Sequence, residues 1–193
     1  MPAPETDRPK RLRLFIAVDV PPDVRGLVNE VVAPWRARFP SGRWIPMDNW
    51  HVTLVFLGAT SPDLLEWITS SLTDVAAATH PFRCRVKGLG AFRSTRRARV
   101  LWAGLREDDG AMARLADRLG VALAREFTPE RRELTPHLTV ARFDPPVELG
   151  EELAHVVLRS EPFEVDRITL YRSHLRRPWP VYEPVAVFRF PGD

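Results

Sequence analysis

The chain has 193 residues and a mean hydropathy of -0.20, which is typical of one ordinary water-soluble domain or of two small lobes with a shared core. Its apolar stretches are only strand-sized, and the stretch 12–20 contains Arg13 and Asp19, so the sequence predicts neither a membrane span nor a secretory signal. The formal net charge is only +3 despite a pI of about 9.6, which excludes a strongly basic protein.

The first half of the chain alternates strand and helix patterns. Proline can begin a helix because the first turn does not need its missing N–H, and a β-branched run closed by Gly58 is typical of a strand. In chain order we predict a polar, proline-rich tail over 1–10, a strand over 12–20, a helix over 21–38, an extended stretch over 42–45, a strand over 50–57 and a helix over 62–79.

The second half repeats this order. In chain order we predict paired strands over 82–92 and 99–105, a helix over 109–126, a strand over 134–143, a helix over 148–158, and closing strands over 162–173 and 181–190. Each half therefore holds a strand, a helix and a second strand, which we interpret as an internal duplication. The predicted fold is α+β, with two αβ lobes related by an approximate two-fold and antiparallel sheets flanking a central cleft. Because no Gly/Ser-rich linker divides the halves, we expect one bilobal domain over 11–193.

Two copies of one tetrapeptide are the most informative feature of the sequence. They are His51-Val-Thr53-Leu and His137-Leu-Thr139-Val, and each begins an apolar strand at the matching point of its half. Alternate side chains of a strand point to one face, so the imidazole and the hydroxyl of each copy point together. Two such strands side by side would form a pocket with two imidazoles and two hydroxyls.

Two histidines suit the opening of a cyclic phosphodiester. One neutral imidazole can take a proton from water while an imidazolium gives a proton to the departing sugar oxygen. Threonine hydroxyls can donate to the non-bridging oxygens, where negative charge accumulates. A single His-x-Thr is weak evidence, since such a triplet commonly marks a half-exposed strand, but the paired and repeated placement is specific.

Other kinds of site find little support in the sequence. Patterns typical of metal ligands, of a nucleophilic serine elbow and of a phosphate loop are absent, so we expect no cofactor and no metal. Cys84 alternates with apolar residues, which predicts a buried strand position rather than a nucleophile. His80 and His155 are expected to be structural or surface groups, and His174 is a weaker candidate for substrate contact.

The composition bears on compartment and partners. With one cysteine and no export signal, a cytoplasmic location is expected. Lys10 and Lys87 are the only lysines among the 28 basic residues, so arginine supplies the other 26. Arginine forks pair with phosphate oxygens, although an arginine-rich codon usage explains the excess more simply.

The paired motifs resemble the two signatures of the two-histidine (2H) phosphoesterases, and within them the chain is similar to the LigT-like RNA 2′,3′-cyclic phosphodiesterases, once named 2′-5′ RNA ligases. The resemblance covers about residues 12–190. Its supporting stretches are residues 13–18, 44–46, 50–58, 135–142 and 170–173. It implies a bilobal α+β fold and metal-independent opening of RNA 2′,3′-cyclic phosphate ends or cyclic nucleotides to 2′-phosphates.

The resemblance also implies roles for single residues. By it, His51 is the proton donor to the leaving 3′ oxygen and His137 is the base on water. It further implies that Thr53, Thr139 and Arg142 contact the phosphate, and that Phe15 stacks on a base. The expected site therefore consists of the catalytic residues His51 and His137 and the substrate-binding residues Thr53, Thr139, Arg142 and Phe15.

Two points stay open. Arg142 lies an odd number of residues from His137, so a regular strand would turn it away from the pocket unless a bulge or the strand end restores it. Phe15 is equally well explained as a core residue.

The function also has alternatives. The same site could seal a 2′,3′-cyclic phosphate to a 5′-hydroxyl as a 2′-5′ ligation, or serve a non-catalytic RNA- or nucleotide-binding module. Nothing in the sequence demands a partner protein, so we expect a monomer.

Overall fold

The computed structural model describes residues 11–107, 109–129 and 133–192, so the tail predicted over 1–10 lies outside the described residues. Its strands are β1 (Leu12–Asp19), β2 (Arg43–Trp44), β3 (His51–Thr60), β4 (Phe82–Phe92), β5 (Ala98–Arg106), β6 (His137–Val147), β7 (Phe163–Val165), β8 (Arg167–His174) and β9 (Val181–Arg189). The α-helices are α1 (Pro22–Arg38), α2 (Leu65–Ala77) and α3 (Ala111–Leu123), and the 3-10 turns are η1 (Met47–Asn49), η2 (Pro62–Leu64), η3 (Thr95–Arg97) and η4 (Glu151–His155).

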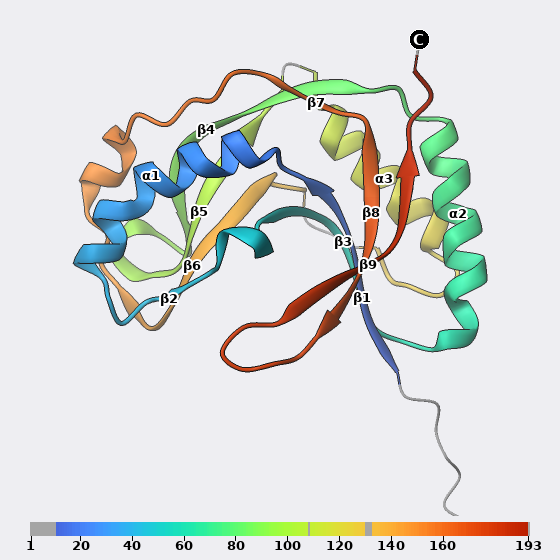
Figure 1. Cartoon of the computed structure of the whole chain (residues 1–193), viewed down its shortest axis with the longest axis horizontal. Coiled ribbons are helices and arrows are strands. Elements are labelled where there is room, and N and C mark those ends of the chain that lie inside the picture. Colours follow the sequence, from blue (N-terminus) through green and yellow to red (C-terminus); the bar gives the residue numbers. More distant parts are fainter. Residues whose placement is uncertain (1–10, 108, 130–132, 193) are drawn as a thin grey trace, which may run out of the picture.

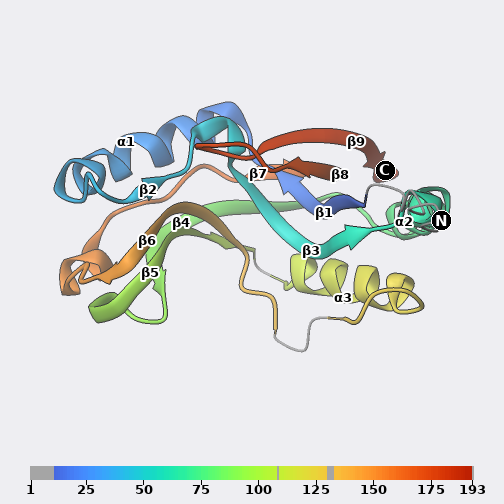
Figure 2. The ribbon, with the colours of Figure 1, turned by 90° about the horizontal axis from the view of Figure 1, so that it is seen from below.

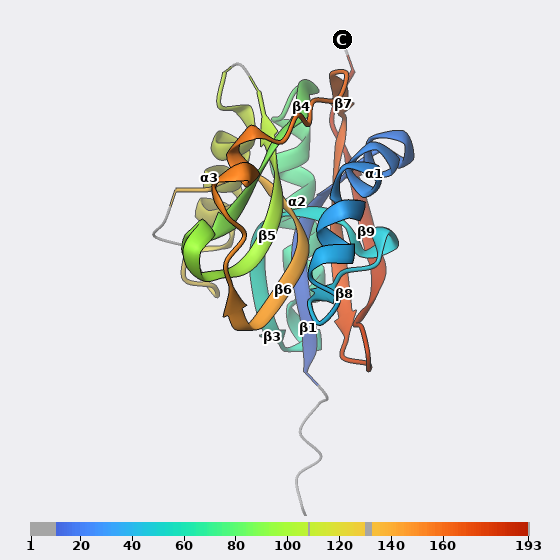
Figure 3. The same cartoon turned by 90° about the vertical axis from the view of Figure 1, so that its left-hand side faces the viewer.

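The strands form one curled antiparallel sheet in the order β7-β4-β5-β6-β3-β1-β8-β9, with β2 paired to β6. Figure 1 shows α2 and α3 side by side at one end of the sheet and α1 at the other. Seen from below, β1, β8 and β9 lie above β5 and β6 (Figure 2), and the view from the side shows the same curl (Figure 3). The fold class is α+β, as predicted; the two-fold relation between two lobes stays a prediction.

The core lies between this sheet and the helices. In the motif strands β3 and β6 the first residues are buried alternately, as the period of two predicts, whereas β1 is buried on both faces from Leu14 to Val18. The apolar stripe of α3, which consists of Met112, Leu115, Leu119 and Leu123, is at most 1% exposed. At the two motifs the sheet therefore keeps one face for packing and leaves the other for polar side chains. No helix of the described residues has the length and apolar character that crossing a membrane requires.

Two of the predicted elements are wrong. The helix predicted over 148–158 is only the 3-10 turn η4, because Gly150 has a φ of 82° and Arg159 instead pairs with Lys87 at the edge of β4. The single strand predicted over 162–173 is two strands that separate at Asp166. β7 pairs with β4 and β8 pairs with β1 and β9, so the chain crosses from one end of the sheet toward the other at this point. In addition, β6 begins at His137 rather than at Leu134.

Candidate active site

The two motif strands are neighbours in the middle of the sheet. β3 and β6 pair in antiparallel fashion through Val52 and Leu138, the second residues of the two motifs. Both are fully buried, so the residues on either side of them, the histidine and threonine of each motif, face the other way. The antiparallel register around this pair places His51 beside Thr139 and His137 beside Thr53. The two rings are close enough that His137 lowers the pKa of His51.

Each motif ends in a β-bulge. The register between β1 and β3 leaves Leu54 without a partner, and the register between β5 and β6 leaves out Val140. Both are the fourth residue of their motif. An extra residue reverses the alternation of a strand, so the side chains five residues after each histidine, Phe56 and Arg142, return to the histidine face. The bulge that Arg142 requires is therefore present, and its guanidinium lowers the pKa of His137.

Both imidazoles are anchored in the same way. Nδ1 of His51 lies 2.9 Å from the carbonyl oxygen of Asn49, and Nδ1 of His137 lies 2.7 Å from the carbonyl oxygen of Thr135. A carbonyl oxygen only accepts, so Nδ1 carries the proton in each ring. Nε2 of each ring is thereby left for proton transfer, and it is the acceptor in the neutral state.

His51 lies in an aromatic setting with one carboxylate. Its ring centroid is 4.8 Å from that of Phe15 and 5.1 Å from that of Tyr182. Burial lowers its pKa to about 4, whereas the carbonyl of Asn49 and the carboxylate of Asp19 raise it. Asp19 is the residue opposite His51 on β1.

Two hydroxyl groups hold that carboxylate in place. Asp19 accepts hydrogen bonds from Thr169, at 2.9 Å, and from the hydroxyl of Tyr171, at 2.6 Å. Burial and the neighbouring Asp19 raise the pKa of Tyr171, so its hydroxyl remains a donor. The negative charge beside His51 is therefore fixed rather than free to turn into solvent.

His137 has different neighbours. Its ring centroid lies 4.8 Å from that of Phe92 and 6.3 Å from that of Trp102. Burial lowers its pKa and Arg142 lowers it further, whereas the carbonyl of Thr135 raises it. The residue opposite His137 on β5 is Gly104, so no carboxylate occupies the place that Asp19 has beside His51.

The open aromatic surface of the site belongs to Phe56 rather than to Phe15. Phe15 is 3% exposed beneath His51, Tyr171 and Tyr182, a packing that favours its alternative interpretation as a core residue. Base stacking by Phe15 stays a prediction. Phe56 is 68% exposed with its ring centroid 6.2 Å from that of Phe15.

A hollow of about 260 Å³ opens beside His51. Its polar lining includes Asp19, Arg25, Asp48, Tyr171 and Tyr182. Burial raises the pKa of Tyr182, while the guanidinium groups of Arg142, Arg43 and Arg13 lower it. Three arginines from three different strands therefore gather at this end of the histidine face.

Sequence reasoning missed most of the surrounding residues, namely Asp19, Phe56, Phe92, Trp102, Tyr171 and Tyr182. The sequence contains one sign that Asp19 belongs to the site, since it is an acidic residue at the end of a largely apolar strand. Phe56 follows His51 on β3, and the bulge at Leu54 turns it to the histidine face. The others come from strands far apart in the sequence, and only the pairing of the sheet brings them together.

The remaining histidines lie elsewhere. Nε2 of His174, the last residue of β8, is 2.5 Å from the carboxylate of Glu183, and no substrate role is assigned to it. His155 is exposed on η4. Within the described ranges, no three His, Cys, Asp or Glu side chains converge in a way that could hold a metal ion.

Comparison with known proteins decides the family. The family model described as the 2′-5′ RNA ligase superfamily matches residues 20–177. The chain belongs to this superfamily. The resemblance to LigT-like proteins is thereby confirmed, since the chain is also similar in structure to Escherichia coli LigT complexed with 3′-AMP, with a TM-score of 0.70, 26% identity and coverage of 93% of this chain and 98% of that chain.

Curated superfamily relatives carry the name RNA 2′,3′-cyclic phosphodiesterase. The protein of Archaeoglobus fulgidus is 32% identical over 183 residues, which are 92% of this chain and 99% of the relative. That of Geobacillus stearothermophilus is 29% identical over 95% of this chain, which spans 59% of the relative's length. A crystal structure of a Thermus thermophilus protein has a TM-score of 0.73 at 28% identity and covers 94% of this chain and 100% of that one.

Proposed function

We propose that the protein hydrolyses RNA 2′,3′-cyclic phosphate ends to 2′-phosphates, with His51 and His137 as an acid–base pair and without a metal ion. The observation that carries the proposal is the pairing of β3 with β6 at Val52 and Leu138, which brings the two motifs together on one face. The names of the curated relatives support the substrate class, and so does the LigT neighbour in complex with 3′-AMP.

The step balances with water as the only co-reactant. Nε2 of His137 takes a proton from water as the water oxygen bonds to phosphorus. The bond from phosphorus to the 3′ oxygen breaks, and Nε2 of His51 gives that oxygen its proton. The products are a 2′-phosphate and a free 3′-hydroxyl. His137 ends protonated and His51 ends neutral, so a proton exchange with solvent restores the pair.

The charges around the two rings favour this division of roles. Burial keeps both rings neutral near pH 7 in the free protein, because it lowers both pKa values. A bound phosphodiester anion raises both. Asp19 adds to that rise at His51 and favours its protonated form, while Arg142 opposes it at His137 and favours a neutral base.

The remaining motif residues would stabilise the charge that develops on the phosphate. Thr53 and Thr139 lie half-buried on the histidine face, and Arg142 is exposed on the same face beyond its bulge. Hydroxyl and guanidinium donors aimed at the non-bridging oxygens lower the barrier most where water is excluded. The open ring of Phe56 would stack on the terminal base, with Phe15 as its support.

Product analysis tests the proposal. A nucleoside 2′,3′-cyclic phosphate incubated with the protein in EDTA should yield the nucleoside 2′-phosphate. The 3′-phosphate as product would contradict the assigned leaving group, and loss of turnover in EDTA would contradict metal independence. Binding without turnover would instead favour a nucleotide-binding module.

The family description makes 2′-5′ ligation a second candidate activity. It is the same attack on phosphorus, with the 5′-hydroxyl of a second RNA as the nucleophile in place of water and the 3′ oxygen again as the leaving group. Water at its bulk concentration favours hydrolysis.

The cytoplasmic location and the monomeric state stay predictions.

A further inference from the structure

Four cationic side chains gather on the histidine face at the far end of the β4–β5 ladder. They are Arg85 and Lys87 of β4, Arg106 at the end of β5, and Arg159, which bridges to Lys87. Together with Glu107 they line an open hollow of about 290 Å³. We refer to these four residues as the β4–β5 cationic patch.

The sheet forces these like charges together. Arg85 stands directly opposite Arg106 in the antiparallel ladder, and Lys87 stands opposite Arg159. Like charges in directly opposed positions destabilise a sheet. Across the described parts of the chain, none of the four forms an ion pair with a carboxylate. An arrangement that costs stability, and in which no ion-paired carboxylate is found among the described residues, is typical of a site for an external anion.

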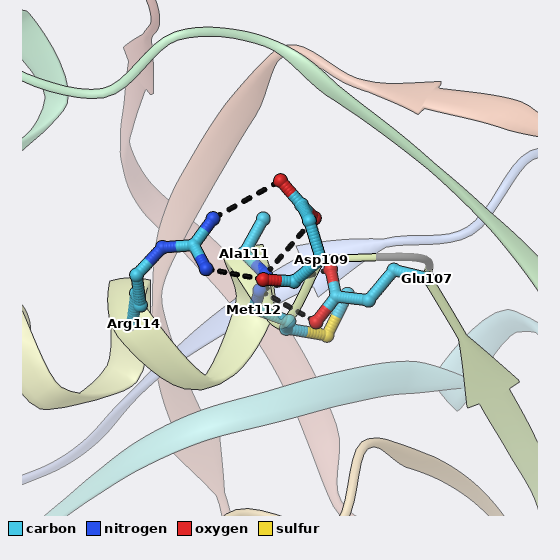
Figure 4. A network of polar contacts seen from close by, with 5 residues as sticks. All are labelled: Glu107, Asp109, Ala111, Met112 and Arg114. Carbon is cyan, nitrogen blue, oxygen red and sulfur yellow. Dashed lines mark hydrogen bonds and ion pairs between the residues drawn. The ribbon is translucent and has the colours of Figure 1, made fainter.

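The one described carboxylate in the hollow has another task. Both oxygens of Glu107 accept the backbone N–H of Met112, at 2.7 and 2.9 Å, at the beginning of α3 (Figure 4). The neighbouring Asp109 pairs with Arg114 of the same helix. Glu107 is therefore committed to capping α3, and the hollow keeps an excess of positive charge.

The patch continues from the active site along one strand. Gly104 stands opposite His137, and Arg106 is two residues further along β5, about 7 Å away on the same face. Arg142 lies on the opposite side of His137, since it pairs with Val100. The catalytic pair thus has Arg142 on one side and the patch on the other.

Two glycines near His137 accommodate the ring of Trp102. A Cβ atom at Gly104 would lie 3.0 Å from the carbonyl oxygen of Lys87, and one at Gly90 would lie 2.2 Å from the ring of Trp102. That ring therefore lies directly on the backbone of β4. The absence of side chains at both glycines makes room for this ring, which lies beside His137 on the same face.

We propose that the β4–β5 cationic patch binds the backbone phosphates of the RNA nucleotides that precede the cyclic phosphate. This inference rests on the proposed function and adds a preference for RNA chains over mononucleotides. A mononucleoside 2′,3′-cyclic phosphate has a single phosphate, and the histidine pair and Arg142 bind it. A longer RNA brings further phosphates, and arginine forks bind these without regard to sequence.

The experiment compares two substrates. One is a nucleoside 2′,3′-cyclic phosphate, and the other is an RNA of about ten nucleotides with the same end, a length within the usual span of single-strand sites. The test variant carries Arg106→Gln and Arg159→Gln. The control carries Arg118→Gln and Arg125→Gln, which remove the same charge on and just after α3.

The test variant should raise KM for the RNA by about tenfold, as the loss of two phosphate contacts allows. It should leave kcat for both substrates and KM for the mononucleotide within about twofold of wild type. The slope of log KM against log salt concentration should flatten by about 1.4, since each phosphate contact contributes about 0.7 for a single strand. The control variant should match wild type.

An unchanged KM for the RNA would overturn the inference, and so would an equal loss with both substrates. If the wild-type protein hydrolyses neither substrate, the proposed function fails instead. Fluorescence anisotropy with an RNA that ends in a 2′-phosphate then still tests the patch. The test variant should bind this RNA about tenfold more weakly than the control, and equal binding would overturn the inference.

Discussion

The two halves of the candidate site share one scaffold but differ in charge. In both, the histidine has Nδ1 tied to the carbonyl two residues earlier, and in both a bulge falls on the fourth motif residue. The residue opposite the histidine is Asp19 in one half and Gly104 in the other. Five residues after the histidine stand Phe56 and Arg142. The comparison teaches that the repeated backbone places the rings, and the unlike neighbours give them unlike tasks.

The largest expected effect is at the two rings themselves. His51→Ala and His137→Ala should each lower kcat by about 10²–10⁴, since each removes one proton transfer. The double variant should be little worse than either single one, because the two rings act as a unit. Steady-state kinetics with a nucleoside 2′,3′-cyclic phosphate measure this, with His155→Ala as the control. Full activity in both single variants would refute the mechanism.

Arg142 should have the next largest effect. Arg142→Gln should lower kcat by about 10², because it removes one charged donor from the phosphate. Arg142→Lys keeps the charge but loses the bidentate fork, so it should recover only part of the activity. If Arg142→Gln has wild-type kinetics, the bulge in β6 serves the fold and not the site.

Substitutions of Phe56 test whether the aromatic side of the site, next to His51, binds the terminal base. Phe56→Ala should raise KM by about tenfold and leave kcat nearly unchanged, since base stacking contributes about 1–3 kcal/mol. Phe56→Leu retains an apolar side chain without the ring and should behave like the alanine variant. An unchanged KM in both variants would leave Phe56 without a role in binding.

Asp19 should give a smaller but more specific effect. Asp19→Asn removes the charge that raises the pKa of His51, so the limb of kcat/KM that His51 sets should move to lower pH. A fall of about 0.5 to 1 in the pKa of His51 lowers kcat/KM by about three- to tenfold at pH values above that limb. Tyr171→Phe removes a hydrogen-bond donor to Asp19 but leaves the charge of Asp19 in place, so this variant should move the same limb less. A limb that stays in place with Asp19→Asn would make Asp19 purely structural.

Sequence patterns predicted most elements because their signals are local. The stripe of α3 and the alternation at the beginning of β3 follow from periodicity alone, and β1 follows from its continuous apolar run. The failures depend on distant partners. The break at Asp166 exists because β7 and β8 pair with different strands, and η4 is short because the following segment pairs with β4.

The candidate site also divides into residues that a local pattern predicts and residues that distant strands bring into place. His51, Thr53, His137 and Thr139 were found because the pattern His-x-Thr followed by an aliphatic residue occurs twice. The bulges at Leu54 and Val140 carry no glycine or proline signal, so strand parity alone could not place Arg142 or Phe56. Asp19 becomes a neighbour of His51 only through the register of β1 with β3.

The pH dependence of kcat/KM for a nucleoside 2′,3′-cyclic phosphate tests the central claim most directly. It reports the free protein, in which the pKa of His51 is lowered to about 4 and that of His137 is also lowered. The active form carries one proton on the pair, so the rate falls in acid as the base is protonated and falls in alkali as the acid is lost. The account predicts a bell with its maximum below pH 6.5, the ordinary pKa of histidine, and a kcat profile displaced to higher pH by the bound anion. A profile of kcat/KM that is flat from about pH 5 to 9, with chemistry rate-limiting, would contradict it.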